Sequence, residues 1–147
     1  MGIMDALRKI VGPSRVSDAE AVCQSYKYNC WVGSEWEMKP DMVVLAETTE
    51  QVSQILKVAN EYCIPVTPKG TMGGGGQGGT FKGGILLDLS LMNKILSINT
   101  HTLKAVAEAG CSFYKLSQEL FKEGLMLPAA AYNICKWGRC KLIHLLL

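Results

Sequence analysis

Glycine fills most of positions 70–79, and Lys69 stands directly before this run. Because glycine has no side chain to restrict its backbone, ordering such a segment costs conformational entropy. The run is therefore expected either to be a flexible connector or to let the backbone approach a ligand closely. Backbone N–H groups beside one lysine charge are the groups that bind a pyrophosphate. The residue types thus predict a phosphate cradle, with the connector as the alternative.

Two common nucleotide-binding loops do not account for the run. Gly73, Gly75 and Gly78 match the spacing of the dinucleotide-binding fingerprint, but that fingerprint requires a helix directly afterwards, whose N-terminus holds the phosphate. The apolar residues 84–89 predict a strand there instead. A P-loop would need Gly-Lys followed by Ser or Thr, and Lys82 does not stand in such a sequence. Both loops are excluded.

The cysteines and histidines predict neither disulfides nor a metal site. The six cysteines contain no CxxC pair, and no signal peptide precedes them, so we expect reduced thiols in a cytoplasmic protein. Cys135, Cys140 and His144 lack a fourth ligand and a standard zinc spacing. The two histidines also lie in segments that do not support nucleophilic hydrolysis.

Composition narrows the function classes further. A chain of 147 residues with 48% hydrophobic and 19% charged residues has the size and make-up of one folded domain. No apolar stretch approaches the length that a membrane span needs. Fifteen Lys and Arg against thirteen Asp and Glu give a net charge of +2, which is too balanced for a general nucleic-acid binder.

The segment before the glycine run predicts two strands joined by a helix. Residues 42–45 are a short apolar run typical of a buried strand, and residues 64–68, with two prolines, are extended. Between them, Thr48 and Gln51 form a capping box for a helix over 49–62. Such a connection is expected to make the two strands parallel neighbours. The apolar face of the helix comprises Val52, Ile55, Leu56, Ala59 and Tyr62.

The first 39 residues predict an N-terminal helical arm. A short helix is expected to end at Gly12, before a proline. Ser17, with Glu20 three residues later, predicts a capping box for a second helix over 18–26. The apolar face of the first helix comprises Leu7, Ile10 and Val11.

After the glycine run, strands are predicted over 84–89 and 103–108. Ser112 is expected to cap a helix that ends before Gly124. The apolar face of this helix comprises Phe113, Leu116, Leu120 and Phe121. Between the two strands, further core residues are expected at Leu91, Met92, Ile95 and Leu96.

Four stretches then follow one another in a specific order: Pro-Asp-Met-Val-Val at 40–44, Ile-Pro-Val-Thr-Pro-Lys-Gly at 64–70, Gly-Gly-Ile-Leu-Leu-Asp-Leu-Ser-Leu-Met-Asn-Lys-Ile-Leu at 83–96, and Ala-Glu-Ala-Gly at 107–110. This order resembles the FAD-binding domain of the vanillyl-alcohol oxidase and p-cresol methylhydroxylase superfamily. Within it, the chain is most similar to the FAD-linked oxidases of glycolate and D-lactate. The resemblance covers residues 6–128 and is strongest over 40–128.

The resemblance implies an α/β (α+β) fold, the first subdomain of the p-cresol-methylhydroxylase-type FAD-binding fold, with a small parallel sheet flanked by helices. The loop after its second strand would wrap the FAD pyrophosphate with main-chain N–H groups. No histidine occurs between positions 69 and 80, where some relatives attach FAD covalently, so non-covalent FAD is expected. Carried over to this sequence, the cofactor-binding residues are Lys69, Gly70, Thr71, Met72, Gly73, Gly74, Gly75 and Gly76, with Lys69 where the family commonly has arginine.

The same resemblance implies an FAD-linked oxidase or dehydrogenase that acts on a 2-hydroxy acid such as glycolate or D-lactate, with hydride transfer to the flavin. Its expected partners are this small-molecule substrate and a redox partner subunit, and no nucleic acid or membrane span is expected. No catalytic residue is assigned, because the family carries these residues on a substrate domain that has no match here.

Residues 129–147 do not match the family pattern, which continues with a second FAD-contacting stretch. We therefore predict a helical arm over 1–39, an FAD-binding subdomain over 40–128 and a non-matching tail over 129–147. On this interpretation the chain is a truncated N-terminal part of the family's fold. The alternative is a non-catalytic nucleotide-binding or interaction module, which would fold alone with its tail ordered against the sheet.

Overall fold

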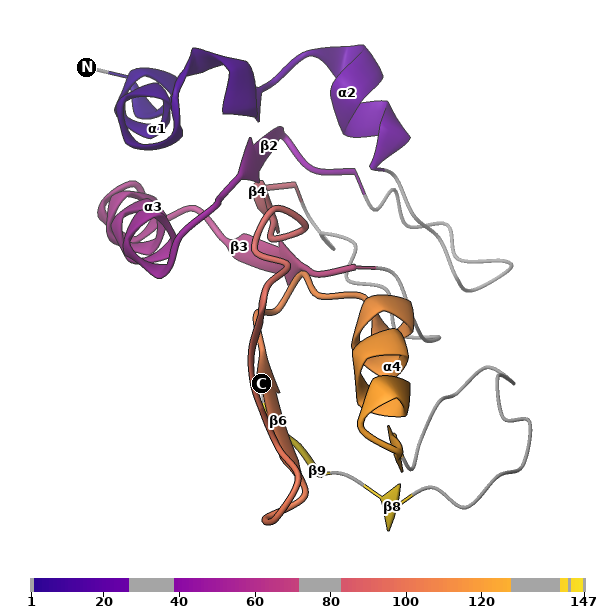
Figure 1. Cartoon of the computed structure of the whole chain (residues 1–147). Coiled ribbons are helices and arrows are strands. Elements are labelled where there is room, and N and C mark those ends of the chain that lie inside the picture. The colour runs from indigo at the N-terminus through magenta and orange to yellow at the C-terminus, as the bar shows by residue number, and fades with distance from the viewer. Residues whose placement is uncertain (1, 27–38, 72–82, 128–140, 143, 147) are drawn as a thin grey trace.

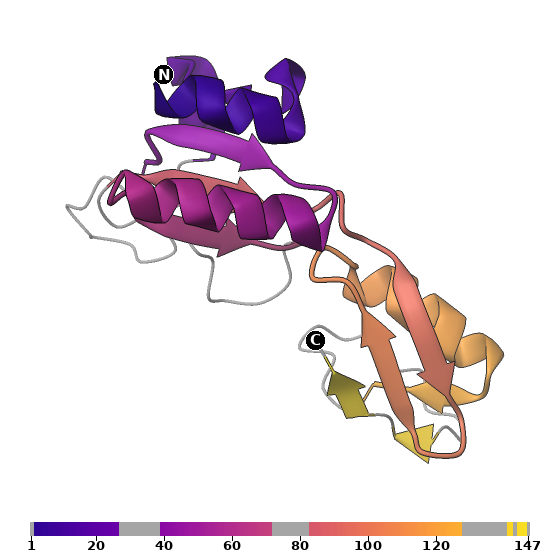
Figure 2. The same cartoon turned by 90° about the vertical axis from the view of Figure 1, so that its left-hand side faces the viewer.

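The structure, a computed structural model, describes residues 2–26, 39–71, 83–127, 141–142 and 144–146. In these segments the helices and strands form two lobes that lie end to end (Figure 2). The first lobe is built on a four-stranded sheet, and the second on a smaller sheet with one helix. This mixed α/β architecture, with a small parallel sheet flanked by helices, confirms the predicted fold class.

The sheet of the first lobe has the strand order β1-β2-β4-β3. In that order the strands are β1 (Val16–Ser17), β2 (Met42–Leu45), β4 (Ile85–Asp88) and β3 (Val66–Lys69). β2, β4 and β3 run parallel, with Val44 and Pro68 both opposite Leu87, whereas β1 lies antiparallel to β2. β2 and β3 are thus parallel, as predicted, but the expectation that they are neighbours was wrong, because β4 lies between them.

The central place of β4 follows from its composition. Ile85, Leu86 and Leu87 are all buried, so this strand needs cover on both faces, as strands inside parallel sheets do. β3 contains Pro68, whose nitrogen has no hydrogen to donate, and proline within sheets is confined mainly to edge strands. The more apolar strand therefore takes the centre, and the strand with the proline takes the edge.

Helices cover both faces of this sheet (Figure 1). α1 (Ile3–Val11) and α3 (Thr49–Glu61) lie on one face, and the shorter α2 (Glu20–Ser25) lies on the other. On the α2 side the buried residues are Cys23, Val43 and Leu86. On the α1 and α3 side they are Leu7, Val11, Val16, Met42, Val44, Ala46, Ile55, Ala59, Ile85 and Leu87. The described part of the predicted arm therefore packs on the sheet, while the segment boundaries at 39 and 128 stay predictions.

α3 begins as the sequence predicts. The Thr48 hydroxyl accepts a hydrogen bond from the Gln51 N–H over 3.2 Å, and the Gln51 side chain accepts one from the Glu47 N–H over 2.8 Å. The predicted apolar face was wrong at two positions, since Leu56 is 48% and Tyr62 is 42% exposed. Ile55 and Ala59 are buried against the sheet and α1, with Val52 and Val58 partly buried beside them, whereas Leu56 and Tyr62 lie at the surface.

The two N-terminal helices differ in how well the sequence predicts them. α1 ends where expected, before Gly12 with its φ of +90°, and a single 3₁₀ turn (Pro13–Arg15) follows. α2 begins only at Glu20, and Ser17 does not cap it; the Ser17 hydroxyl accepts a bond from the Ala19 N–H instead. Ser17 belongs to β1 and pairs with Val43, which places it too far before the helix to serve as the cap.

The second lobe centres on the antiparallel pair β5 (Ile95–Asn99) and β6 (Lys104–Ala107), with α4 (Phe113–Lys122) packed on one face (Figure 1). β9 (His144–Leu146) pairs in parallel with β6, and β7 (Leu125–Met126) pairs in parallel with β8 (Lys141–Leu142). The core of this lobe comprises Ala105, Leu116, Leu120, Leu125 and Leu127.

α4 has the predicted ends and half of the predicted core. The Ser112 hydroxyl accepts a hydrogen bond from the Lys115 N–H over 3.2 Å, and Gly124 after the helix has a φ of +69°. Leu116 and Leu120 are buried, but four apolar residues of the expected core are not: Phe113 is 47%, Phe121 44%, Leu91 39% and Leu96 60% exposed. Among the described residues of this lobe, one helix covers one face of the sheet, so fewer apolar positions are covered than an amphipathic pattern offers.

Among the helices of the described segments, none combines the length and apolar character that crossing a bilayer requires.

Candidate FAD pyrophosphate site

The predicted cradle begins where two parallel strands end. Lys69 is the last residue of β3 and lies opposite Asp88, the last residue of β4. The Leu89 N–H donates to the Lys69 carbonyl over 2.8 Å, which extends the pairing by one step. Ligands of open α/β sheets bind beyond the carboxyl ends of the strands. The glycine run therefore leaves the sheet at the edge where such sites occur.

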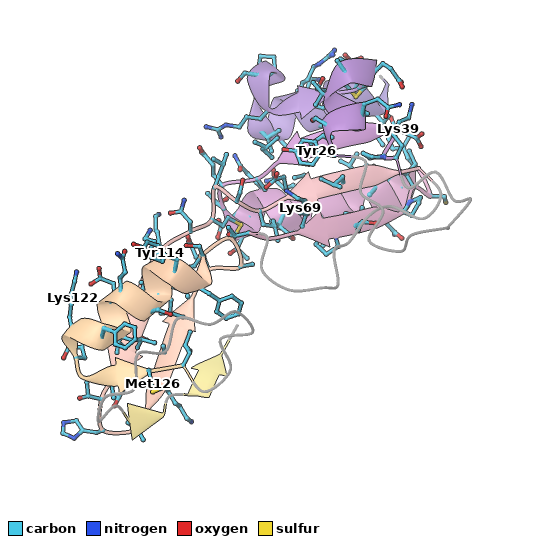
Figure 3. The ribbon with its side chains drawn as sticks, turned by 90° about the vertical axis from the view of Figure 1, so that its right-hand side faces the viewer. Tyr26, Lys39, Lys69, Tyr114, Lys122 and Met126 are labelled. Atoms are coloured by element: carbon cyan, nitrogen blue, oxygen red, sulfur yellow. The ribbon has the colours of Figure 1, made fainter. Side chains whose placement is uncertain are left out.

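Asp88 is buried at this edge, with 3% of the residue exposed. Its Oδ1 accepts a hydrogen bond from the Ser90 N–H, and its Oδ2 accepts one from the Tyr26 hydroxyl, each over 2.8 Å. The Lys69 Nζ lies 3.7 Å from the Asp88 Oδ2 and 4.9 Å from the centre of the Tyr26 ring. Tyr26, Asp88 and Lys69 thus form one contiguous group, here named the Tyr26 cluster; Figure 3 shows Tyr26 and Lys69 close to each other.

The cluster determines the protonation of two groups. Burial raises the pKa of the Asp88 carboxyl, but hydrogen bonds from Ser90 and Tyr26 and the charge of Lys69 outweigh it, so the pKa lies below its ordinary value. Burial, together with the hydrogen bond to Asp88 and the charge of that carboxylate, raises the pKa of Tyr26 to about 12. At neutral pH the site therefore holds an anionic Asp88 and a neutral Tyr26. A tyrosine in this state donates a hydrogen bond and does not act as a base.

Three separate elements bring the cluster together. Parallel register places Lys69 beside Asp88. Tyr26 follows α2 directly, and the burial of Cys23 against Val43 and Leu86 holds that helix on the sheet. The ring of Tyr26 then packs against this same small core, which leaves its hydroxyl within reach of the carboxylate.

The next two loop residues, Gly70 and Thr71, contact the turn between β6 and α4. A Cβ on Gly70 would lie 2.6 Å from the Ala109 carbonyl oxygen, so this approach requires glycine. The Thr71 hydroxyl donates a hydrogen bond to the Gly110 carbonyl. Gly110 is buried, and a Cβ there would overlap the Leu89 carbonyl oxygen. The start of the glycine run is therefore fixed at the junction of the two lobes.

The structure describes part of the predicted cradle. Lys69, Gly70 and Thr71 lie together at the strand ends, whereas Met72 and positions 73–76 lie outside the described residues. The assignment of these residues to the cofactor remains a prediction.

Sequence reasoning missed Asp88 and Tyr26. A carboxylate directly after three consecutive apolar residues is a usable signal for Asp88, because a charged residue inside a buried strand needs a partner. No local signal identifies Tyr26, since its partner is 62 positions away in the sequence.

The described residues contain no group of three His, Cys, Asp or Glu side chains that could hold a metal ion. Cys135 and Cys140 lie outside the described residues. Their spacing in the sequence does not match that of a standard zinc site. Cys23, Cys63 and Cys111 carry free thiols.

A protein-family model described as an FAD binding domain matches residues 40–138. The chain belongs to this FAD-binding family. The match includes β2, the complete glycine run and β4, so it covers the segment that carries the site. It confirms the resemblance on which the cofactor prediction rests.

The curated relatives of this chain are longer oxidoreductases. D-lactate dehydrogenase of Anaerostipes hadrus is 30% identical over 121 residues, which cover 82% of this chain and 25% of the relative. A glycolate oxidase subunit of Bacillus subtilis is 28% identical over 128 residues, covering 86% of this chain and 27% of the relative. The chain spans about a quarter of the length of these relatives.

Solved structures confirm the fold. Substrate-bound p-cresol methylhydroxylase matches with a TM-score of 0.70 and 25% identity, over 85% of this chain and 25% of that protein. 4-Ethylphenol oxidase from Gulosibacter chungangensis matches with a TM-score of 0.70 and 28% identity, over 83% of this chain and 24% of that protein. This chain therefore has the p-cresol-methylhydroxylase-type fold and belongs to a family of flavoprotein oxidoreductases.

Proposed function

We propose that this chain holds the pyrophosphate of FAD at the start of its glycine run. Lys69, Gly70 and Thr71 form the described part of this cradle, and residues 72–76 complete it. The observation that carries the proposal is the position of Lys69, a cation with 29% side-chain exposure at the carboxyl end of β3. Its ammonium complements a diphosphate, and the residues that follow it have no side chain at most positions to block backbone N–H groups.

Titration of the chain with FAD, followed by flavin fluorescence, tests this cradle. Lys69→Met is expected to weaken FAD binding by about tenfold, since it removes one charge-assisted contact of about 1.4 kcal/mol. Lys57→Met is the matched control, because it removes the same charge from an exposed position on α3. ADP should compete with FAD, whereas riboflavin, which has no pyrophosphate, should not. Equal FAD affinity of the Lys69→Met and Lys57→Met variants would contradict the assignment.

We further propose that the chain serves the oxidation of a 2-hydroxy acid such as glycolate or D-lactate. The support is the pair of relatives named D-lactate dehydrogenase and glycolate oxidase subunit. When bound, FAD supplies the acceptor for a hydride, and the protein supplies binding and orientation. Because the chain spans only a quarter of its relatives, the test uses a chimera in which it replaces the matching quarter of the D-lactate dehydrogenase of Anaerostipes hadrus. In the anaerobic FAD-loaded chimera, D-lactate should bleach the visible flavin absorbance and L-lactate should not. An unchanged spectrum in a chimera that binds FAD would contradict this substrate class without affecting the binding proposal.

FAD attachment is proposed to be non-covalent. The support is the sequence of the glycine run, which has no histidine between positions 69 and 80 to form a bond to the flavin. Acid denaturation of the loaded chain followed by ultrafiltration should release all flavin into the filtrate. Flavin retained with the denatured protein would show covalent attachment.

A redox partner subunit and a cytoplasmic location are also proposals. Support for a partner comes from 4-cresol dehydrogenase of Pseudomonas putida, a relative named as a flavoprotein subunit and 36% identical over 77 residues. Free thiols at Cys23, Cys63 and Cys111 agree with a reducing compartment, although some curated relatives are mitochondrial. Fractionation of cells that express the tagged chain, followed by purification from each fraction, tests both.

One observation favours the alternative of a non-catalytic nucleotide-binding module. That alternative expects the C-terminal segment to be ordered against the sheet, and the backbone of β9 pairs with β6. A module of this kind would bind ADP as tightly as FAD and would leave the flavin oxidised with every 2-hydroxy acid. The titration and bleaching experiments above therefore distinguish the two functions.

A further inference from the structure

The proposed cradle uses Lys69 but gives no role to the two side chains that contact it. Asp88 is a buried charge in an otherwise apolar strand, and Tyr26 reaches it from the C-terminal end of α2. We propose that Asp88 and Tyr26 are positioning residues, which hold the Lys69 ammonium in the orientation that the FAD pyrophosphate requires. This inference rests on the proposed function of Lys69.

The distances show that Asp88 attracts the Lys69 ammonium without accepting a hydrogen bond from it. The Lys69 Nζ lies 3.7 Å from the Asp88 Oδ2, which is longer than the roughly 2.7–2.9 Å of a charge-assisted hydrogen bond. Each carboxylate oxygen already accepts a closer hydrogen bond, Oδ1 from Ser90 and Oδ2 from Tyr26. Asp88 therefore attracts the ammonium electrostatically while leaving the ammonium N–H donors for another acceptor.

Tyr26 is a second group that restricts the position of the Lys69 ammonium. Its ring centre lies 4.9 Å from the Lys69 Nζ, within the range of about 6 Å in which a cation is attracted to an aromatic face. The ring and the carboxylate, joined by the Tyr26 hydrogen bond, are thus two neighbouring groups that both attract the ammonium. The Lys69 side chain nevertheless keeps 29% exposure, so a ligand can approach from the remaining side.

A lysine held in this way is preorganised for ligand binding. An unrestrained lysine loses rotamer freedom when it contacts a ligand, and this loss weakens the affinity. The Tyr26 cluster imposes the restriction during folding, before the ligand arrives. The opposing possibility is that Asp88 simply neutralises Lys69, in which case its removal would strengthen the binding of an anion. The two roles therefore predict opposite signs for the same substitution.

A double-mutant cycle on FAD affinity decides between them. Asp88→Asn keeps the size of the side chain and one acceptor oxygen, but it removes the charge and replaces the second acceptor with an NH2 donor. It is expected to weaken FAD binding by about tenfold. In the Lys69→Met background the same substitution should change the affinity by less than about twofold, because its effect passes through Lys69. Tighter binding by Asp88→Asn, or an equal loss in both backgrounds, would overturn the proposal.

Tyr26 offers a matched pair of variants. Tyr26→Phe keeps the ring beside the ammonium and is expected to bind FAD within about threefold of the unmodified chain, whereas Tyr26→Leu removes the ring and should bind about tenfold more weakly. Equal affinities of the two variants would contradict a role for the ring. Thermal unfolding of each variant without FAD verifies that the chain still folds.

A measurement without FAD separates this inference from the proposed function. Ultraviolet titration of tyrosinate, with Tyr26→Phe as the reference that assigns the signal, should show Tyr26 ionising well above its ordinary pKa. In Asp88→Asn this ionisation should move to lower pH. Ionisation of Tyr26 at its ordinary pKa in the unmodified chain would overturn the cluster itself. If instead the tyrosine behaves as expected and Lys69→Met binds FAD normally, the cradle and the positioning role both fail although the cluster exists.

Discussion

The central strands of the two sheets differ in burial. All four residues of β4 in the first lobe are buried, whereas β6 in the second lobe has two buried residues and its neighbour β5 has none. Helices cover both faces of the first sheet, and α4 covers one face of the second. A parallel sheet needs cover on both faces, because its strands are apolar throughout. This double cover is what creates the dry environment in which Asp88, a buried carboxylate, is paired and fixed beside Lys69.

Because of this contrast in burial, we expect the largest difference in the free energy of unfolding between two leucine substitutions, one in each lobe. Leu87→Ala in β4 should lower the free energy of unfolding by about 3 kcal/mol, because it leaves a cavity at a position that is 2% exposed. Leu96→Ala in β5, which is 60% exposed, should lower it by less than about 0.5 kcal/mol. Urea denaturation of both variants provides the comparison. Similar losses would show that the lobes are packed equally well.

The stability of the chain should be nearly as sensitive to a substitution at the junction of the lobes. Gly110→Ala forces a Cβ against the Leu89 carbonyl oxygen and should destabilise the chain by about 2 kcal/mol through a backbone shift. The control is Gly124→Ala, where no atom lies within 4 Å of the new Cβ and the cost, about 1 kcal/mol, comes from the φ of +69°. Thermal unfolding measures both. A smaller loss at Gly110 than at Gly124 would mean that the junction yields easily.

Helix capping should contribute equally to stability in the two lobes. Thr48 caps α3 and Ser112 caps α4, each with one hydrogen bond of 3.2 Å from the backbone. Thr48→Ala and Ser112→Ala should each cost about 1 kcal/mol. Urea denaturation checks the equality, and Thr48→Ser, which keeps the hydroxyl, is the control. Unequal costs would indicate that the helices, and not only the sheet layers, distinguish the lobes.

The last expected effect is a pH dependence that belongs to the first lobe. The folded pKa of Tyr26 is raised from 10.0 to about 12, so between these values the folded state keeps a proton that the unfolded state has lost. Stability should therefore fall as pH rises through this window. The folded pKa of Asp88 is lowered, so stability should also fall as acid protonates its carboxylate. Chemical denaturation across pH measures both slopes, and Tyr26→Phe should remove the alkaline one.

Local features of this fold were predictable from the sequence. The caps at Thr48 and Ser112, the helix ends at Gly12 and Gly124, and the strands β2, β3, β4 and β6 depend on residues close together in the chain, which is why their patterns identify them. β5 was predicted only as a set of core residues. The cradle, which is also inferred from a local motif, stays a prediction.

Features that depend on distant partners were not predictable. Nothing in the sequence of β3 shows that β4 will lie between it and β2, because periodicity describes one strand at a time. The exposure of Leu56 and Phe121 depends on how many layers surround a helix, which its own sequence does not specify. The Tyr26 cluster forms only when α2 and the sheet have packed, so half of the candidate site is a product of tertiary structure.

Pro68 has a consequence for the outer edge of the first sheet. The carbonyls of Pro65 and Lys69 point toward β4, where they accept bonds from Ile85 and Leu89, so the intervening even-numbered residues direct their backbone groups outward. At Pro68 that outward position has no N–H. Strand addition by another chain requires a continuous row of donors and acceptors, and proline interrupts it. The residue just before the predicted cradle therefore also protects the sheet against edge-to-edge aggregation.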